Sequence, residues 1–193
     1  HSRDYSAQLA EAHFRVTQVF RSASNKGFGQ GNNELLERAR GRCFFALNAD
    51  VILEKDSLDN LLKVMDAAPD VASVSGILLQ ADEQGKRTGK VDCAGHHLYR
   101  DFSCRSVHPA DVRPSNPKLY SMPRQVFGAP GAAAMYRSDR MRELGGFDAR
   151  FFAYWEDVDL DARIALKGWR SLCSPEIIGQ HFRGGRAQDR PAI

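Results

Sequence analysis

Residues 43–47 (CFFAL) form a continuous apolar run that ends directly in Asn48-Ala49-Asp50. Such a short run is typical of a central strand that is buried on both faces of a sheet. Residues 56–67 then place leucines and a methionine on one helical face, and residues 71–79 are a second apolar run. This alternation of strand, helix and strand predicts an α/β sheet with mostly parallel strands.

The acid that follows the first apolar run, Asp50, is a candidate metal ligand. In open α/β sheets, ligands bind beyond the carboxyl ends of the strands. Carboxylate oxygens are also the ligands that Mg²⁺ and Mn²⁺ prefer. A helix cap or a turn would explain an acid at this position as well.

Residues 25–33 (NKGFGQGNN) hold three glycines and three asparagines. We expect this segment to interrupt regular structure between a strand at 14–20 and a helix at 34–40, after a short helix at 6–12. Glycines would let the backbone approach a ligand closely, and asparagine side chains would supply hydrogen-bond donors and acceptors. An ordinary strand-to-helix turn accounts for this composition equally well.

The periodicity fades between residues 80 and 124, where a hairpin-like turn at 81–90 is followed by several prolines. This pattern predicts a long loop, because the periodicity is lost and prolines recur. We interpret it as a flap or as a segment on the side where an acceptor substrate would bind, because long loops in compact domains are usually functional or mobile. Three histidines of this segment lack ligand spacing and are expected to be solvated. They are His96, His97 and His108.

Two short apolar segments flank a tight turn in residues 125–137 (QVFGAPGAAAMYR). Gly128 and Gly131 keep the side chains of this turn small, which leaves room for a ligand against the backbone. A short helix is expected at 138–144 and a last strand at 171–173.

The densest acidic cluster of the chain lies at the start of a helix that is expected to end near Gly168. Acids at a helix N-terminus complement the macrodipole, which accounts for one or two of them. Tyr154 and Trp155 precede the cluster and could wall a pocket. One acid could then accept a proton while its neighbour holds a substrate hydroxyl or a backbone amide. The four acids are Glu156, Asp157, Asp159 and Asp161.

Composition narrows the partners and the compartment. The length of 193 residues argues for one domain. The net charge of +3, with scattered basic residues, argues against nucleic acid as a partner and is compatible with an anionic small molecule or a membrane surface. The four cysteines lack metal-type spacing, which favours a reducing compartment. No run approaches the ~20 apolar residues of a spanning helix. We therefore expect a cytoplasmic protein, with the inner face of the membrane as a compatible location, and a poorly ordered tail at 183–193.

Five motifs in order resemble those of the family 2 glycosyltransferases with a GT-A fold, and most closely the rhamnosyltransferase-like bacterial branch. The motifs are NKGFGQGNN, LNAD, FGAPGAAAMYR, GGFDARFFAYWEDVDLDARIALKGW and a late His181. The resemblance implies a GT-A (Rossmann-like) domain over residues 1–182, with a mixed, mostly parallel sheet flanked by helices. It also implies that the first strand and helix of the family, before His1, and the helices that follow His181 are absent here.

The same resemblance implies a nucleoside diphosphate sugar donor, a divalent cation, Mg²⁺ or Mn²⁺, and inversion at the anomeric carbon. Asn48 stands where the metal motif has its first Asp, which leaves Asp50 as the metal ligand. Asp157 matches the general base and Glu156 its acceptor-orienting neighbour, although an error of one residue in register would swap them. The remaining candidates are Asn25, Gly27, Asn33, Asn48 and Asp50 for the donor, Gly128, Gly131, Tyr154 and Trp155 for the acceptor, and His181 for the metal or diphosphate.

His181 is predicted to lie beside Asp50, because residues 177–178 can return to the sheet next to the strand that ends at Leu47. The chain would then move a sugar onto the hydroxyl of a saccharide or lipid-linked acceptor in polysaccharide or glycolipid synthesis. The alternative is a non-catalytic nucleotide-sugar-binding or scaffold domain of the same fold. A nucleotidyltransferase with a similar sheet is less consistent, because the acidic helix would have no task in it.

Overall fold

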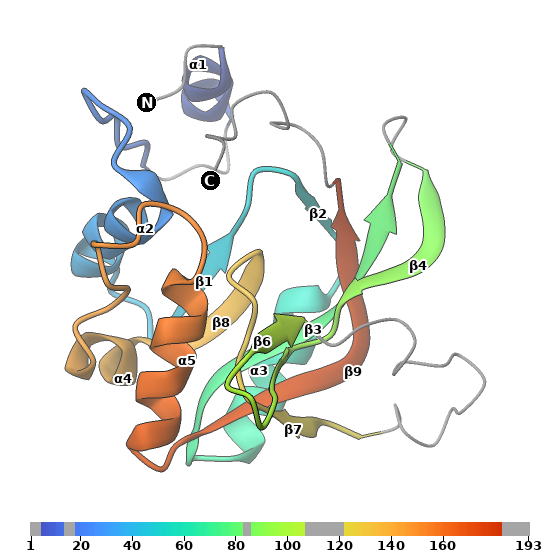
Figure 1. Cartoon of the computed structure of the whole chain (residues 1–193). Helices are drawn as coiled ribbons and strands as arrows, with labels where there is room; N and C mark the ends of the chain where they lie inside the picture. Colours follow the sequence, from blue (N-terminus) through green and yellow to red (C-terminus); the bar gives the residue numbers. More distant parts are fainter. Residues whose placement is uncertain (1–4, 14–17, 83–85, 107–121, 183–193) are drawn as a thin grey trace.

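The computed structural model describes residues 5–13, 18–82, 86–106 and 122–182. A mixed seven-stranded sheet crosses the centre of the molecule, and a two-stranded sheet lies beside it (Figure 1). The large sheet consists of β1 (Cys43–Leu47), β2 (Val51–Leu53), β3 (Val71–Ala81), β4 (Arg87–Cys93), β7 (Arg124–Val126), β8 (Ala133–Arg137) and β9 (Arg170–His181). The small sheet is β5 (His96–Leu98) and β6 (Cys104–Ser106). The helices are α1 (Ser6–Ala12), α2 (Gly27–Arg38), α3 (Ser57–Ala67), α4 (Ser138–Glu143) and α5 (Glu156–Leu166).

Helices cover both faces of the large sheet, which gives three layers (Figure 1). On one face, Phe44 and Tyr136 pack with apolar residues of α2, α4 and α5. On the other face, Leu61 and Met65 of α3 pack against Val74 and its neighbours. The α/β class expected from the apolar runs is therefore confirmed, and α3 follows the predicted helix closely.

The strand order is β1-β8-β3-β9-β2, with β4 beside β3 and β7 beside β9. Strands β1 and β3 are both antiparallel to β8, so they run in the same direction, and β9 is parallel to β3. The common direction predicted for the strands at 43–47 and 71–79 is thus correct. The expectation of mostly parallel pairs is wrong, because β8 inserts between β1 and β3, and β2, β4 and β7 also pair antiparallel. A local alternation of strand and helix carries no information on a later strand that inserts.

The glycine- and asparagine-rich segment is helical from Gly27 onward, where interrupted structure was expected. Gly27 has a φ of +77°, and its N–H donates to Asn25 Oδ1 at 3.0 Å, so these two residues form the turn into α2. A Cβ on Gly27 would lie 2.1 Å from the Phe152 carbonyl oxygen, and one on Gly29 would lie 3.3 Å from Phe147 Cβ. The glycines therefore allow α2 to pack closely on the segment that precedes α5.

Two strand predictions were wrong in extent. Residues 18–20 are not in a strand, and residues 14–17 of the strand expected at 14–20 lie outside the described residues. β9 is far longer than the strand expected at 171–173, because it continues past Pro175 to His181. Its pairing with β3 shifts register between Ser75 and Ile77, beside the proline. A proline lacks the N–H of a ladder, so a bulge lets the strand continue.

The hairpin-like turn expected at 81–90 is confirmed by the antiparallel pairing of β3 with β4. The rest of the predicted loop contains β5 and β6, which pair antiparallel. Residues 107–121, with His108, and the tail at 183–193 lie outside the described residues. In the ranges that are described, no helix combines the length and apolar character needed to cross a bilayer.

Candidate active site

The turn between β7 and β8 makes hydrogen bonds both with the segment that follows β1 and with the first turn of α5. The Asn48 N–H donates to the Ala132 carbonyl at 2.9 Å. The N–H of the preceding residue, Gly131, donates to Asp157 Oδ2, also at 2.9 Å. Two successive residues of one turn thus contact both the predicted metal segment and the acidic helix. The sequence predicted this turn but not the contacts that it makes.

The glycines of this turn have different neighbours. A Cβ on Gly131 would lie 3.2 Å from the Phe28 ring and 3.4 Å from Asp157 Cβ, so Gly131 lets the turn approach both residues. A Cβ on Gly128 would lie 1.6 Å from Asp161 Oδ2. The space that we expected Gly128 to leave for a ligand is therefore filled by the Asp161 side chain.

His181 lies beside Asp50, as the sequence predicted. Its Nε2 is 3.2 Å from Asp50 Oδ1, and its Nδ1 is 2.8 Å from Asp92 Oδ2. The strands next to His181 are β2, whose Val51 pairs with His181, and β3, whose Gln80 pairs with it, and not the strand that ends at Leu47. The Asp92 side chain is 1% exposed and that of Asp50 is 41% exposed. The imidazole therefore stands between a buried and a half-exposed carboxylate.

Asp92 was missed by the sequence analysis. It lies in β4, which pairs with β3, and β3 in turn pairs with β9, so the sheet brings Asp92 to His181 across an intervening strand. A signal was present, since Asp92 stands between Val91 and Cys93 in a stretch that the structure buries. An acid in such a stretch requires a partner, because Asp is almost never fully buried without one.

Asp50 and His181 fit a divalent cation that is shared with a diphosphate. They offer one carboxylate oxygen and one imidazole nitrogen, ligands that Mn²⁺ accepts. Within the described ranges, no group of three or more His, Cys, Asp or Glu side chains forms a closed metal site. Mg²⁺ and Mn²⁺ at phosphate sites usually take one or two carboxylates and complete their coordination with phosphate oxygens and water. The carboxylate of Asp92 on the second nitrogen of His181 matches the partner that orients a metal-ligating histidine.

A cavity of about 370 Å³ opens beside the start of α2 and the end of β1. This volume is within the range of small-ligand pockets. Its lining includes Phe28, Asn32, Asn48 and Ala49. Asn48 therefore lines this cavity, and its predicted role in donor binding stays a prediction. The Asn33 side-chain amide instead binds the Phe147 backbone: its Nδ2 donates to the carbonyl at 2.8 Å, and its Oδ1 accepts the N–H at 2.9 Å.

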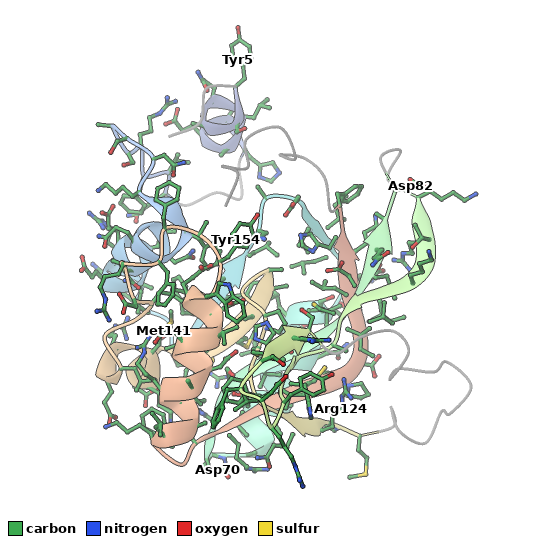
Figure 2. All side chains as sticks on the ribbon, viewed as in Figure 1. Tyr5, Asp70, Asp82, Arg124, Met141 and Tyr154 are labelled. Carbon is green, nitrogen blue, oxygen red and sulfur yellow. The ribbon has the colours of Figure 1, made fainter. Side chains whose placement is uncertain are left out.

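Tyr154 and Trp155 occupy left-handed backbone conformations directly before α5, with φ values of +72° and +75°. Such angles are costly for residues with a side chain and persist only where the surroundings impose them. Both rings are exposed, by 70% and 55%. Figure 2 shows Tyr154 close to the N-terminal end of α5. The two rings that were predicted to line a pocket are therefore exposed to solvent at the N-terminal end of α5.

Glu156 and Asp157, which are neighbours in sequence, have different environments. Glu156 is buried, its Oε2 has no hydrogen-bond partner among the described residues, and burial, followed by the charge of Asp157, raises its pKa. The Asp157 side chain is 19% exposed and accepts N–H groups from Gly131 and Val158, each at 2.9 Å. Asp157 is therefore the oriented and accessible carboxylate of the two.

His96 was expected to be solvated, and that expectation is wrong. It is buried, its Nδ1 is 2.7 Å from Asp161 Oδ2, and its Nε2 is 3.8 Å from Asp157 Oδ2. Asp161 is fully buried, and its Oδ1 accepts the Ala129 N–H at 3.2 Å. Spacing alone could not reveal this arrangement, because β5 meets α5 only through the tertiary fold.

Burial and the neighbouring charges shift the pKa values of this buried pair. Burial raises the pKa of Asp161 to about 6, although the hydrogen bond from His96 opposes the shift. For His96, burial lowers the pKa, but the contacts with Asp161 and Asp157 raise it by more, so that its pKa lies above the usual value. The pair therefore holds a proton more tightly than isolated side chains would.

Comparison with known proteins identifies the family. Residues 1–143 match the model of the family described as Glycosyl transferase family 2. This chain belongs to glycosyl transferase family 2. The matched residues include Asp50, Asp92 and His96, whereas Asp157 and His181 lie beyond them, so that the positions of the last two rest on the geometry above.

Two curated relatives and two solved structures extend this family assignment. Both relatives are N-acetylglucosaminyl-diphospho-decaprenol L-rhamnosyltransferases of Mycobacterium tuberculosis, from strains CDC 1551 / Oshkosh and ATCC 25618 / H37Rv. Each is 33% identical over 75 residues, which cover 39% of this chain and 24% of the relative. The chain thus matches about a quarter of the length of these glycosyltransferases.

The two solved structures share the fold. GalNAc-T7 with UDP, GalNAc and Mn²⁺ superposes with a TM-score of 0.71 at 15% identity, over 100% of this chain and 37% of that one. The mannosyltransferase PcManGT from Pyrobaculum calidifontis, with GDP-Man and Mn²⁺, gives a TM-score of 0.61 at 21% identity. The match covers 93% of this chain and 44% of the mannosyltransferase. The fold of this family 2 chain is therefore that of GT-A glycosyltransferases.

Proposed function

We propose that this chain forms the catalytic domain of an inverting glycosyltransferase. It transfers a sugar from a nucleoside diphosphate sugar to a hydroxyl group of a saccharide or lipid-linked acceptor, in polysaccharide or glycolipid synthesis. One observation carries the proposal: adjacent residues of the turn between β7 and β8 contact the Asn48 segment and Asp157. A site for the donor diphosphate and a site for a base thus meet at one turn.

The donor side consists of Asp50, His181 and the neighbouring cavity. Asp50 and His181 would hold Mg²⁺ or Mn²⁺ with the diphosphate, and Asp92 would orient the His181 ring. A bound cation neutralises the charge that develops on the diphosphate as it leaves. The names of the structural neighbours support this choice, because both complexes contain Mn²⁺ with a nucleotide or nucleotide sugar. Asn32 and Asn48 line the cavity that would take the nucleotide, and Asn25 and Gly27 shape the turn into α2.

The acceptor side consists of Asp157 and the exposed rings of Tyr154 and Trp155. The acceptor hydroxyl oxygen attacks the anomeric carbon, the bond to the diphosphate breaks, and the diphosphate leaves with the electron pair. The hydroxyl proton passes to the Asp157 carboxylate, which Gly131 and Val158 hold by their N–H groups. Glu156, buried beside it, would orient the acceptor. The curated relatives support a lipid-linked acceptor, because their name specifies N-acetylglucosaminyl-diphospho-decaprenol.

Calorimetric titration with UDP, GDP and dTDP, with and without Mn²⁺, tests the donor side of the proposal. We expect nucleotide binding that requires the metal, followed by sugar transfer in a turnover assay with the corresponding nucleotide sugars. Metal-dependent binding without transfer, in a preparation shown to be folded, would favour a non-catalytic nucleotide-sugar-binding domain. No metal-dependent binding to any of the three nucleotides would contradict the proposal.

A further inference from the structure

The backbone of His96 is fixed on both sides. Its N–H donates to the Gly128 carbonyl at 2.8 Å, and its carbonyl accepts the Phe127 N–H at 2.9 Å. The preceding residue, Gly95, has a φ of +92°, and a Cβ there would lie 2.6 Å from Val126 Cγ1. The backbone of His96 is therefore held in place by the segment that leads into the turn beside Asp157.

Asp161 determines which nitrogen of the His96 ring faces Asp157. The Asp161 carboxylate has no exposed surface, and it occupies the space beside Gly128 that a Cβ would otherwise fill. An ionised carboxylate only accepts hydrogen bonds, so its 2.7 Å contact requires a proton on His96 Nδ1. In the neutral ring, Nε2 then carries a lone pair, and this nitrogen is the one that faces Asp157 Oδ2.

We propose that His96 is a positioning residue for Asp157 and the next acceptor of the proton that Asp157 takes from the acceptor hydroxyl. This inference rests on the proposed function of Asp157. Asp161 keeps the proton on Nδ1, and the carboxyl proton of Asp157 moves to Nε2, which lies 3.8 Å from Asp157 Oδ2, in a step that requires the two side chains to approach each other. The proton thus passes from the hydroxyl oxygen to the carboxylate and then to the ring. The product is an imidazolium between two carboxylates.

Titratable groups around His96, other than Asp157 and Asp161, lie on α5, β6 and β8. Glu156 and Asp161 accompany Asp157 on α5, and burial raises the pKa of both carboxyl groups. Burial also raises the pKa of Cys104, on β6, to about 11 and that of Tyr136, on β8, well above its usual value. Both of these groups are therefore neutral near pH 7. The charge state of His96 then responds to Asp157 and Asp161.

NMR of the ring nitrogens tests the inference without an assay of turnover. Long-range ¹H–¹⁵N spectra of the chain, labelled at histidine, report the tautomer and the pKa of His96 across pH. We expect the Nδ1–H tautomer in the neutral ring and a lower pKa in the Asp157→Asn variant, because that change removes a facing carboxylate. An Nε2–H tautomer, an unchanged pKa in Asp157→Asn, or a ring that stays doubly protonated wherever the chain is folded would overturn the proposal.

Asp161→Asn distinguishes proton transfer from simple support of the fold. An asparagine can keep the contact with Ala129 through its oxygen while its amide donates to His96 Nδ1, which moves the ring proton to Nε2. In an active preparation, Asp161→Asn and His96→Gln should each lower kcat by about 10-fold or more, the scale seen when a partner that orients a functional side chain is lost. The KM for the donor should not change, and the pH profile should shift.

His97→Gln, on the exposed side of the same strand, is the matched control. Unchanged kcat in both His96→Gln and Asp161→Asn, with donor binding and turnover otherwise intact, would refute the role of His96 alone. If the unsubstituted chain does not bind the donor nucleotide in a metal-dependent way, the proposed function is refuted instead. The two failures are therefore distinguishable.

Discussion

Among the residues that the structure describes, two histidines each stand between two aspartates. In both arrangements Nδ1 contacts a buried carboxylate, Asp92 at 2.8 Å from His181 and Asp161 at 2.7 Å from His96. The outer carboxylates differ. Asp50 is 41% exposed and 3.2 Å from its histidine, whereas Asp157 is 19% exposed and 3.8 Å from its own.

This difference underlies the two roles that we propose, metal binding by Asp50 and His181 and proton transfer by Asp157 and His96. Asp50 and His181 present an oxygen and a nitrogen close together at an open edge, as a shared cation requires. Asp157 instead receives N–H groups from Gly131 and Val158 and leaves a gap before His96. The same residue types thus suit different chemistry, because the outer carboxylates differ in their backbone hydrogen bonds and in their exposure to solvent.

The largest effect is expected from Asp157→Asn. This change removes the proton acceptor but keeps the shape of the side chain, so the turnover rate should fall by roughly 10²-fold or more. Donor affinity, measured by calorimetry, should change little. Glu156→Gln is the matched variant. If it abolishes turnover while Asp157→Asn retains it, the roles of the two neighbours are reversed.

A smaller effect is expected from Asp92→Asn on the metal side. Loss of the carboxylate that orients a ligating histidine typically costs about 10- to 100-fold in metal affinity. Titration of Mn²⁺ in the presence of nucleoside diphosphate should show this loss, and saturating Mn²⁺ should restore most of the turnover. Asp161→Asn should leave Mn²⁺ affinity unchanged. Equal losses in both variants would remove the distinction between the two histidines.

The smallest effect concerns the pH dependence of stability. The pKa of Asp161 is about 6 in the folded chain, above the usual 3.8, so the folded state holds this proton more tightly than the unfolded state. The resulting stabilisation is present below about pH 4 and is lost as the pH rises through about 6. The raised pKa of His96 acts in the same sense at higher pH.

Urea unfolding at several pH values measures this effect. Between about pH 4 and pH 7, the wild-type chain should lose roughly 1 to 3 kcal/mol of unfolding free energy relative to Asp161→Asn, since one pKa unit corresponds to about 1.4 kcal/mol. A difference that stays constant, or that grows in favour of the wild type as the pH rises, would show that Asp161 does not carry a raised pKa.

Local patterns predicted the elements that local physics determines. The run at 43–47 is β1, and the amphipathic segment at 56–67 is α3, because strand burial and helical periodicity are visible over a few residues. The acidic cluster does begin α5. The proximity of His181 to Asp50 also followed from the expected return of the chain to the sheet, although the neighbouring strand is β2.

Long-range pairing hid the remaining features. Nothing near β1 indicates that β8 will insert beside it, and nothing near His96 indicates that Asp161 will cover it. Pro175 stopped the predicted last strand, although a register shift lets β9 continue. The glycines after Asn25 resembled a ligand loop, and the sequence did not reveal that Gly27 and Gly29 allow α2 to pack closely on Phe152 and Phe147. In each case the deciding contact lies far away in sequence.

Titration calorimetry of one chain and two variants tests the division of labour most directly. Nucleoside diphosphate is titrated with and without Mn²⁺ into the wild type, Asp50→Ala and Asp157→Asn, with Asp59→Ala on the exposed side of α3 as a control. Metal-dependent binding should disappear in Asp50→Ala and persist in Asp157→Asn and in the control. Unchanged binding in Asp50→Ala, or its loss in Asp157→Asn, would contradict the assignment of binding to one Asp–His–Asp set and of proton transfer to the other.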